Sequence, residues 1–217
     1  MMSRSEFPKA LFFSLFSSYC PGVHVIAAVV AALTTGLALA AFSPAAFAAW
    51  DVQQLMDSLA QNKSGRAAFV EKKYIAVLDK PVESSGELVY TAPDGLEKLT
   101  FRPKPEAMVV KGGDLVVKRG KQQHRLQLQT YPELAAFIDS IRGTLAGDRK
   151  ALERNFRLSL DGTAERWILQ LQPLDEKMQA VVLRIAISGV REQVRGIEII
   201  QADGDRSVMV MENLAKP

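Results

Sequence analysis

The sequence predicts a mainly β protein in which helices cover an antiparallel sheet. Beyond residue 61, most of the chain consists of short segments in which apolar and polar residues alternate, with Gly, Pro or Asp between them. A period of two is typical of strands with one buried face, and about eleven such segments follow one another. One block, residues 130–156, has apolar residues at helical spacing instead. No linker or low-complexity run divides the segments, which indicates one domain.

The N-terminal residues carry a targeting pattern. Residues 23–42 are almost all apolar, and Ser43-Pro44 and the small-x-small run Ala46-Phe47-Ala48 follow them. This order predicts a secretory signal peptide over residues 1–48, cleaved after Ala48, and therefore a protein of the Gram-negative periplasm. The alternative is an uncleaved anchor, because about 20 apolar residues can span a bilayer. The helix-breaking pair and the cleavage pattern favour the signal peptide.

The composition argues against several classes of function. The chain has 27 Lys and Arg against 24 Asp and Glu, a net charge of +3, which is too small to indicate nucleic-acid binding. Cys20, the only cysteine, precedes residues 23–42, so no disulfide or thiol chemistry is expected beyond it. His124 lies among polar residues, and the sequence has no metal-ligand spacing or nucleophile–base pair. We therefore expect no cofactor, no metal and no enzymatic activity, and an envelope hydrolase is the weakest hypothesis.

The elements are expected in a simple order. A short helix over residues 50–61 comes first, with Val52, Leu55, Met56 and Leu59 on one face. Strands are expected before the helical block over residues 66–77, 86–91, 96–102, 107–111, 115–118 and 124–128. Strands are expected after it over residues 156–160, 166–171, 183–188, 194–200 and 207–211. Turns are predicted at Pro93-Asp94-Gly95, Gly112-Gly113, Asp161-Gly162 and Asp203-Gly204.

The central helical block presents one apolar stripe. Thr130 and Glu133 stand three residues apart, as in a capping box, and Pro132 fits the first turn. Gly147 is expected to end the helix, and Asp148 to cap a second, short helix. The stripe must be buried against the sheet, either as a permanent plug or as a removable lid. Its members are Leu134, Phe137, Ile138, Ile141 and Leu145.

Beneath these helices, the apolar faces of the strands enclose an interior that is either a packed core or a pocket for an apolar ligand. The residues expected to line it are Phe69, Leu88, Tyr90, Phe101, Met108, Trp167 and Leu169. The tripeptide Gly-Asp-Arg occurs twice, ending at Arg149 and at Arg206. Both copies can be ordinary turns. Alternatively, Arg142, Arg149 or Arg206 gathers at the mouth of the interior and holds a lipid head group or an acidic partner.

Three runs of sequence carry a resemblance to a known family. They are SSGELVYTAPDGLEKLTFRPKPEAMVVKGGDL (residues 84–115), IRGTLAGDRKALERNF (residues 141–156) and QADGDRSVMVM (residues 201–211). The pattern G-x-L-x-Y-x-x-P from Gly86 to Pro93 is similar to one shared in the LolA-like superfamily, the periplasmic lipoprotein carriers and their relatives. The runs L-A-G-D and G-D-R-S-V resemble the subgroup often linked to envelope lipid or aryl-polyene synthesis.

The resemblance implies an incomplete antiparallel β-barrel of about eleven strands with a helical lid, formed by residues 49–217 as a single lipid-binding domain. It also implies a monomeric periplasmic carrier of acyl chains, which takes its cargo from an inner-membrane donor and passes it to an outer-membrane acceptor. The motifs of the lipoprotein carrier proper are not found, so the cargo stays open among lipoprotein, glycolipid, aryl-polyene lipid and free acyl chain. The alternative is a periplasmic sensor or interaction domain of the same fold with a filled core.

Overall fold

The structure, a computed structural model, describes residues 50–214. The signal peptide predicted over residues 1–48 lies outside the described residues. Within the described part of the chain, none of the helices combines the length and the apolar character needed to cross a membrane.

The described residues contain eleven antiparallel strands in one open sheet, in the order β6-β5-β4-β3-β2-β1-β11-β10-β9-β8-β7. This confirms the prediction of an incomplete β-barrel. The first strands are β1 (Ser64–Tyr74), β2 (Val82–Thr91), β3 (Gly95–Arg102), β4 (Glu106–Lys111), β5 (Asp114–Arg119) and β6 (Gln122–Gln127). The last are β7 (Phe156–Thr163), β8 (Arg166–Pro173), β9 (Val182–Val190), β10 (Gln193–Gln201) and β11 (Arg206–Asn213).

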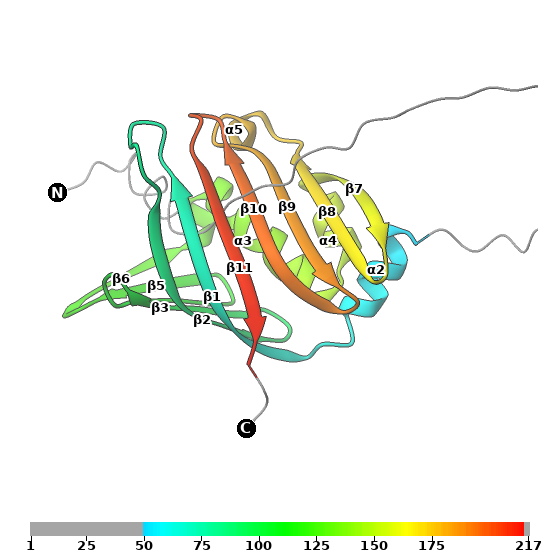
Figure 1. The fold of residues 1–217 in the computed structure, drawn as a ribbon, viewed down its shortest axis with the longest axis horizontal. Helices are drawn as coiled ribbons and strands as arrows, with labels where there is room; N and C mark the ends of the chain where they lie inside the picture. Colours follow the sequence, from blue (N-terminus) through cyan, green and yellow to red (C-terminus); the bar gives the residue numbers. More distant parts are fainter. Residues whose placement is uncertain (1–49, 215–217) are drawn as a thin grey trace, which may run out of the picture.

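The order of the strands explains why the barrel stays open. Each strand pairs with the next one in the chain except that β6 does not pair with β7, and β1 also pairs with β11, from Ala67 opposite Asn213 to Tyr74 opposite Arg206. The free edges are therefore β6 and β7, and the chain between them forms the central helices. Figure 1 shows the sheet curving around these helices, which lie on its concave side.

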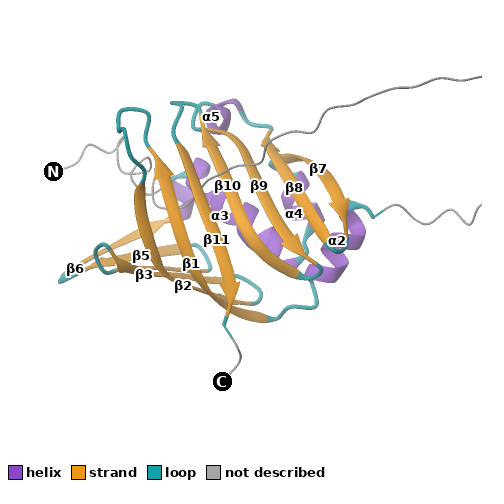
Figure 2. Ribbon diagram, in the orientation of Figure 1, coloured by secondary structure: helices purple, strands orange, loops and turns teal. Residues whose placement is uncertain are grey.

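The three main helices match the sequence prediction, whereas one 3-10 turn and one short helix were not predicted. The helical elements are α2 (Val52–Leu59), the 3-10 turn η1 (Leu128–Thr130), α3 (Pro132–Ala146), α4 (Arg149–Glu153) and the short helix α5 (Glu176–Gln179). Figure 2 shows α3 and α4 behind the strands, with α2 and α5 at opposite ends of the sheet. Leu55, Met56 and Leu59 of α2 are buried, as its spacing predicted.

The predicted C-terminal end of α3 is correct, whereas the capping box predicted at its N-terminus is wrong. The N-cap is Tyr131, without a side-chain hydrogen bond, and Thr130 belongs to η1, so the predicted capping box of Thr130 and Glu133 is absent. Pro132 begins the helix as expected. Gly147 ends it in the left-handed conformation (φ 67°), and the Asp148 side chain accepts a hydrogen bond from the Ala151 N–H at 2.9 Å, as a cap of α4.

Two predictions in the second half of the sheet are wrong. The turn expected at Asp161-Gly162 comes later, because both residues still pair with β8 and the chain turns after Thr163. In the strand expected over residues 183–188, the spacing of Leu183, Ile185 and Ile187 predicts one inward face, but Leu183 is exposed and its neighbour Val182 is buried. A register shift between β9 and β10 at this point reverses the alternation.

Candidate functional site

An apolar pocket of about 440 Å³ lies between α3 and the concave face of the sheet. One wall is α3, and the other is built from β1 to β5 together with β10 and β11. Strand residues point alternately to the two faces of a sheet, so the inward side chains form most of this wall, while some neighbouring residues, such as Val89, also line the pocket. The apolar side chains of the lining are Leu59, Ala67, Leu88, Val89, Tyr90, Leu96, Met108, Val110, Leu115, Leu134, Phe137, Ile138, Ile141, Leu145, Val194, Ile197, Met211 and Leu214.

The pocket reaches the surface beside the start of β1. Ser64, Gly65, Arg66 and Leu214 belong to the lining and are exposed, whereas the lining residues of β4 and β5 are buried. At the same place the Asn62 side chain donates to the Glu192 carbonyl at 2.7 Å, which ties the α2–β1 connection to the β9–β10 turn. We call this end of the pocket, around Ser64 and Leu214, the opening.

All five residues of the predicted stripe on α3 lie in the pocket wall: Leu134, Phe137, Ile138, Ile141 and Leu145. Phe137 is fully buried and Ile141 is 9% exposed. The strand residues Leu88, Tyr90 and Met108 lie in the opposite wall, as predicted. The structure therefore brings eight of the predicted lining residues together; their role in binding stays a prediction.

Three other predicted lining residues belong to the core outside the pocket. Phe69, Trp167 and Leu169 are buried but do not line it. Trp167 packs on Gly189, its partner across β8 and β9, and its Nε1 donates to the Arg191 carbonyl at 2.7 Å. Tight packing of this kind leaves no space for a ligand.

The prediction for Phe101 is wrong, because its side chain is 52% exposed on the outer face of β3. The inward positions of this strand belong to Leu96, Lys98 and Thr100, and Lys98 and Thr100 are buried. The apolar residues of β3 suggested the opposite alternation. Lys98 can point inward only because a buried carboxylate receives its ammonium group.

That carboxylate is Glu71, which is fully buried on the concave face of β1. It accepts hydrogen bonds from Lys98 Nζ at 2.7 Å, Ser84 Oγ at 2.9 Å and Ser207 Oγ at 2.8 Å. Lys73 Nζ lies 3.9 Å from its other oxygen. We call these five residues the Glu71 cluster. Because Lys98 lines the pocket and its ammonium binds Glu71, the cluster forms the end opposite the opening.

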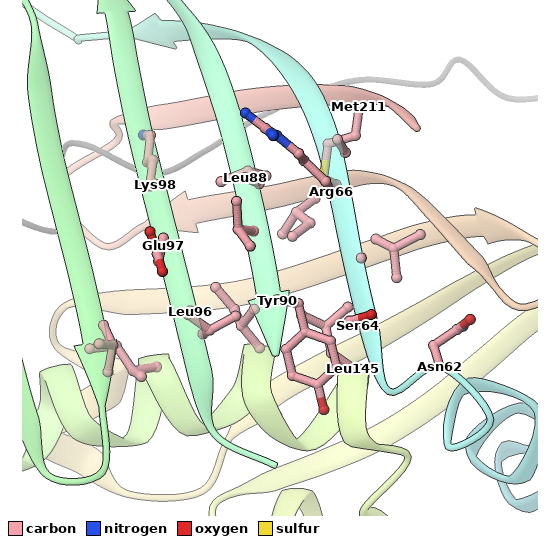
Figure 3. A pocket seen from close by; sticks show the side chains of 18 of the residues that line it. Asn62, Ser64, Arg66, Leu88, Tyr90, Leu96, Glu97, Lys98, Leu145 and Met211 are labelled. Atoms are coloured by element: carbon pink, nitrogen blue, oxygen red, sulfur yellow. The ribbon is translucent and has the colours of Figure 1, made fainter. Parts of the chain in front are cut away.

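Tyr90 lies nearer the opening, since it pairs with Gly65 whereas Lys98 pairs with Leu88. Figure 3 shows the Tyr90 and Lys98 side chains extending in opposite directions from the level of Leu88. The Tyr90 side chain is 6% exposed, and its hydroxyl is buried without a hydrogen-bond partner among the described residues. Burial, with a smaller contribution from the Asp94 carboxylate, raises the pKa of the Tyr90 phenol above its ordinary value.

The three predicted arginines do not gather at the opening. Arg142 donates from Nε to the Asp94 carbonyl at 2.8 Å and from Nη2 to the Gly112 carbonyl at 2.9 Å, which fastens α3 to two turns of the sheet. Arg149 pairs with Glu153 on α4 at 2.7 Å. Arg206 stacks over the Tyr74 ring at 4.6 Å, about 30 Å along β1 from Ser64.

Within residues 50–214 no group of three His, Cys, Asp or Glu side chains could hold a metal ion. The polar groups near the pocket either pair with each other, as in the Glu71 cluster, or donate to backbone carbonyls, as Arg142 does. What the arrangement offers a ligand is a deep apolar surface, and beside it lies the buried Tyr90 hydroxyl, which has no partner among the described residues.

The open sheet, the helix across its concave side and the pocket between them define the class of half-barrel proteins with a helical lid. The comparisons place the chain within this class. A family model described as outer membrane lipoprotein carrier protein LolA-like matches residues 44–216. Since this match spans most of the chain, the protein belongs to that LolA-like family, as the three runs of sequence predicted. A search of curated proteins found no match.

Solved structures that resemble this chain share little of its sequence. The LolA superfamily protein NE2245 of Nitrosomonas europaea is 12% identical, with a TM-score of 0.43, over 78% of this chain and 96% of that chain. A chain of the Pseudomonas aeruginosa MucA/MucB complex is 14% identical, with a TM-score of 0.43, over 76% and 58%. The Mycobacterium tuberculosis lipoprotein LppX is 7% identical, with a TM-score of 0.40, over 74% and 93%.

Proposed function

We propose that this protein is a periplasmic carrier that binds acyl chains of a lipoprotein or another envelope lipid in its pocket and takes them towards the outer membrane. The observation that carries the proposal is the apolar pocket enclosed between α3 and the sheet. Membership in a family described by its likeness to a lipoprotein carrier supports the same function. A carrier needs no catalytic group, because its task is reversible burial of apolar surface.

The size of the pocket suits one aliphatic chain at a time in the closed state. A methylene group occupies a volume similar to that of a water molecule, about 30 Å³ in the liquid, so the pocket holds on the order of 15 methylenes. Burying ten of them gains about 8 kcal/mol before the cost of ordering the chain. This is enough for specific loading and still small enough for release.

The lid in this proposal is α3. Its apolar stripe covers the same surface that a lipid would cover, so lipid and stripe compete for the strands, and a partly loaded state can return to the closed one. Loading requires α3 to move, and the hydrogen bonds of Arg142 to the Asp94 and Gly112 carbonyls are the contacts it must give up. An inner-membrane donor and an outer-membrane acceptor would act on the side of the molecule that α3 covers.

The test is to identify lipid in the protein purified from its own periplasm without detergent, by mass spectrometry of an organic extract. We expect bound lipid with the natural chain. Ala67 lies in the pocket wall and its neighbour Ala68 points to the outer face, so Ala67→Phe should abolish the bound lipid and Ala68→Phe should retain it. Folded natural protein without lipid, under conditions in which the donor membrane is present, would contradict the proposal.

A second candidate function is a sensor or interaction domain that binds a protein partner. Two valines favour it: Val70 and Val210 pair across β1 and β11 on the outer face, and they are 50% and 57% exposed. Neighbouring exposed apolar residues can mark an interaction surface. Crosslinking in cells distinguishes the two functions, because a sensor keeps its partner when Ala67→Phe fills the pocket, whereas a carrier loses its cargo.

A further inference from the structure

We infer that Tyr90 recognises the bound lipid by donating a hydrogen bond from its hydroxyl to the carbonyl oxygen that links the acyl chain to its head group. This inference rests on the proposed carrier function and names the chemistry that the pocket selects: an acyl ester or amide rather than a plain hydrocarbon chain. It makes Tyr90 a specificity residue, while the rest of the wall supplies apolar area.

The first argument is that the hydroxyl lacks a partner. Tyr90 Oη is buried, and no described residue forms a hydrogen bond with it. A buried polar group without a partner is unfavourable, and nearly all such groups in folded proteins are paired. The exceptions call for an explanation, and a ligand that completes the hydrogen bond is one when the residue lines a pocket, as Tyr90 does.

The second argument is the position of Tyr90 in the pocket. The residue pairs with Gly65 at the level of the opening, and the apolar wall continues one inward position further along the strands, to Leu88 and Met108 at the level of Lys98. A chain that enters at the opening therefore places its hydrocarbon tail along the deep wall and its linkage at the level of Tyr90. Figure 3 shows the Tyr90 hydroxyl directed away from Lys98, towards the end of the pocket where Ser64 and Leu145 are labelled.

The third argument is that the Tyr90 hydroxyl keeps its proton and can therefore donate a hydrogen bond. Burial raises the pKa of the phenol, and the Asp94 carboxylate raises it further, so Tyr90 keeps its proton throughout the neutral range. A neutral hydroxyl donates to a carbonyl without requiring a charge in the ligand. The charged residue of the lining at the deep end, Lys98, is already paired with Glu71 and does not compete for the linkage.

The hydroxyl is buried in this closed state, so a ligand reaches it only when the surrounding wall rearranges. The empty protein thus carries an unpaired donor that a carbonyl satisfies and a hydrocarbon does not. Discrimination between otherwise equal chains then follows from a single group, because a site built to hydrogen-bond a polar atom disfavours an analogue that lacks it.

The experiment compares Tyr90→Phe with the natural protein, since this change removes only the hydroxyl. Displacement of the neutral dye phenylnaphthylamine measures the affinity for methyl decanoate, for its N-methyl amide and for dodecane, an alkane of similar chain length. We expect Tyr90→Phe to weaken binding of the carbonyl ligands by about threefold to tenfold and to leave dodecane binding equal or tighter. Tyr131→Phe, a partly buried tyrosine outside the pocket lining, is the matched control and should change none of the three.

A second measurement guards against an indirect effect on folding. The empty Tyr90→Phe protein should unfold at the same or a higher urea concentration than the natural protein, because it loses an unpaired donor.

The ligand assay also indicates the kind of lipid that the pocket selects. A loss of affinity for the ester alone indicates a glycerolipid or a lipoprotein's diacylglyceryl group, and a loss for the amide alone indicates an N-acylated lipoprotein.

The outcomes separate this inference from the proposed function. If the natural protein binds the ligands and Tyr90→Phe weakens none of them, or weakens dodecane equally, the role of Tyr90 is overturned and the carrier function stands. If the natural protein is folded and none of the three ligands displaces the dye from it, both the role of Tyr90 and the carrier function are overturned.

Discussion

A single buried carboxylate organises the charged residues inside this half-barrel. Glu71 is fully buried, and Lys98, Ser84 and Ser207 all donate to it from three different strands. The Lys98 ammonium also lies 5.1 Å from the centre of the Phe69 ring. Removal of one partner of such a pair leaves the other charge buried, which is far more unfavourable than the pair itself. The Glu71 cluster therefore fixes how β1, β2, β3 and β11 are aligned.

Lys73, at the edge of this cluster, makes folding depend on pH. Burial lowers its pKa from 10.5 to about 8 against the opposing effect of Glu71, and Lys98, Glu106 and Arg119 also act on it. Above about pH 8 the folded protein releases this proton while the unfolded chain keeps it up to 10.5, so the unfolded state binds more protons. The free energy of unfolding should therefore rise with pH in this window.

Urea unfolding checks this prediction against Lys73→Met, which removes the titrating group. Between about pH 7 and about pH 9.5 the natural protein should gain about 2 kcal/mol relative to the variant. Subtracting the free energy of unfolding of the variant from that of the natural protein removes the contribution of the ionisable groups that the two proteins share. Equal pH dependence in both would mean that Lys73 keeps its proton in the folded state.

Individual side chains were the least predictable part of the site. The apolar residue Phe101 and the charged residue Lys98 suggested that β3 faces the interior with its odd-numbered positions, and the structure shows the reverse. The decisive partner, Glu71, lies 27 residues away and is invisible to a pattern within one strand. Tyr90, by contrast, was predicted to line the interior from its alternation with Leu88 on β2, and the structure shows that it is buried there.

At the scale of elements, the contact between α2 and the end of α3 depends on one glycine. Gly147 has φ 67°, and a Cβ there would lie 2.1 Å from the Met56 carbonyl oxygen and 2.7 Å from the Ala60 Cβ. The next residue, Asp148, caps α4. The run L-A-G-D that the sequence singled out thus ends one helix, lets another approach closely and begins a third.

We expect Gly147→Ala to destabilise the protein by about 2 kcal/mol or more, because it adds both left-handed strain and a steric clash with the α2 backbone. Urea unfolding measures the loss. Gly113→Ala is the matched control, since the Gly113 Cβ position has no atom within 4 Å, and it should change stability by at most about 0.5 kcal/mol. Equal effects of both changes would show that α2 does not rest on Gly147.

Elements were predictable where local signals were strong. The turns predicted at Gly112 and Gly204, two glycines with positive φ, lie between strands as expected. The turn expected at Gly162 was wrong because this glycine, with φ 100°, lies inside β7 close to the Arg166 carbonyl. The helix α5 was missed because its four residues are too few for helical spacing to emerge.

At the scale of the whole molecule, the helical insertion takes the place of barrel closure. The chain leaves the sheet at β6 and returns at β7, the two free edges, so α3 and α4 necessarily span the open side. Strand β6 is almost entirely polar and exposed, which suits an edge that must not pair with another chain. The arrangement leaves the pocket with one wall of strands and one wall formed by α3, and the choice between plug and lid that the sequence left open depends on whether α3 moves.

Arg142 holds α3 to the sheet, and this contact supplies a test of whether α3 moves. Its two hydrogen bonds reach the β2–β3 and β4–β5 turns, and its side chain is 12% exposed. Arg142→Gln should increase opening of α3 about tenfold, since hydrogen bonds of charged donors contribute about 1.5 kcal/mol or more each and glutamine recovers part of them. Hydrogen–deuterium exchange should be faster in α3 and unchanged in β1 and β11, and a preloaded acyl ligand should leave faster.

Arg149→Gln is the control, because Arg149 pairs only within α4 among the described contacts and fastens nothing to the sheet. If Arg149→Gln accelerates exchange in α3 as much as Arg142→Gln does, or neither changes ligand release, then α3 is a fixed plug and the pocket must be loaded by another route.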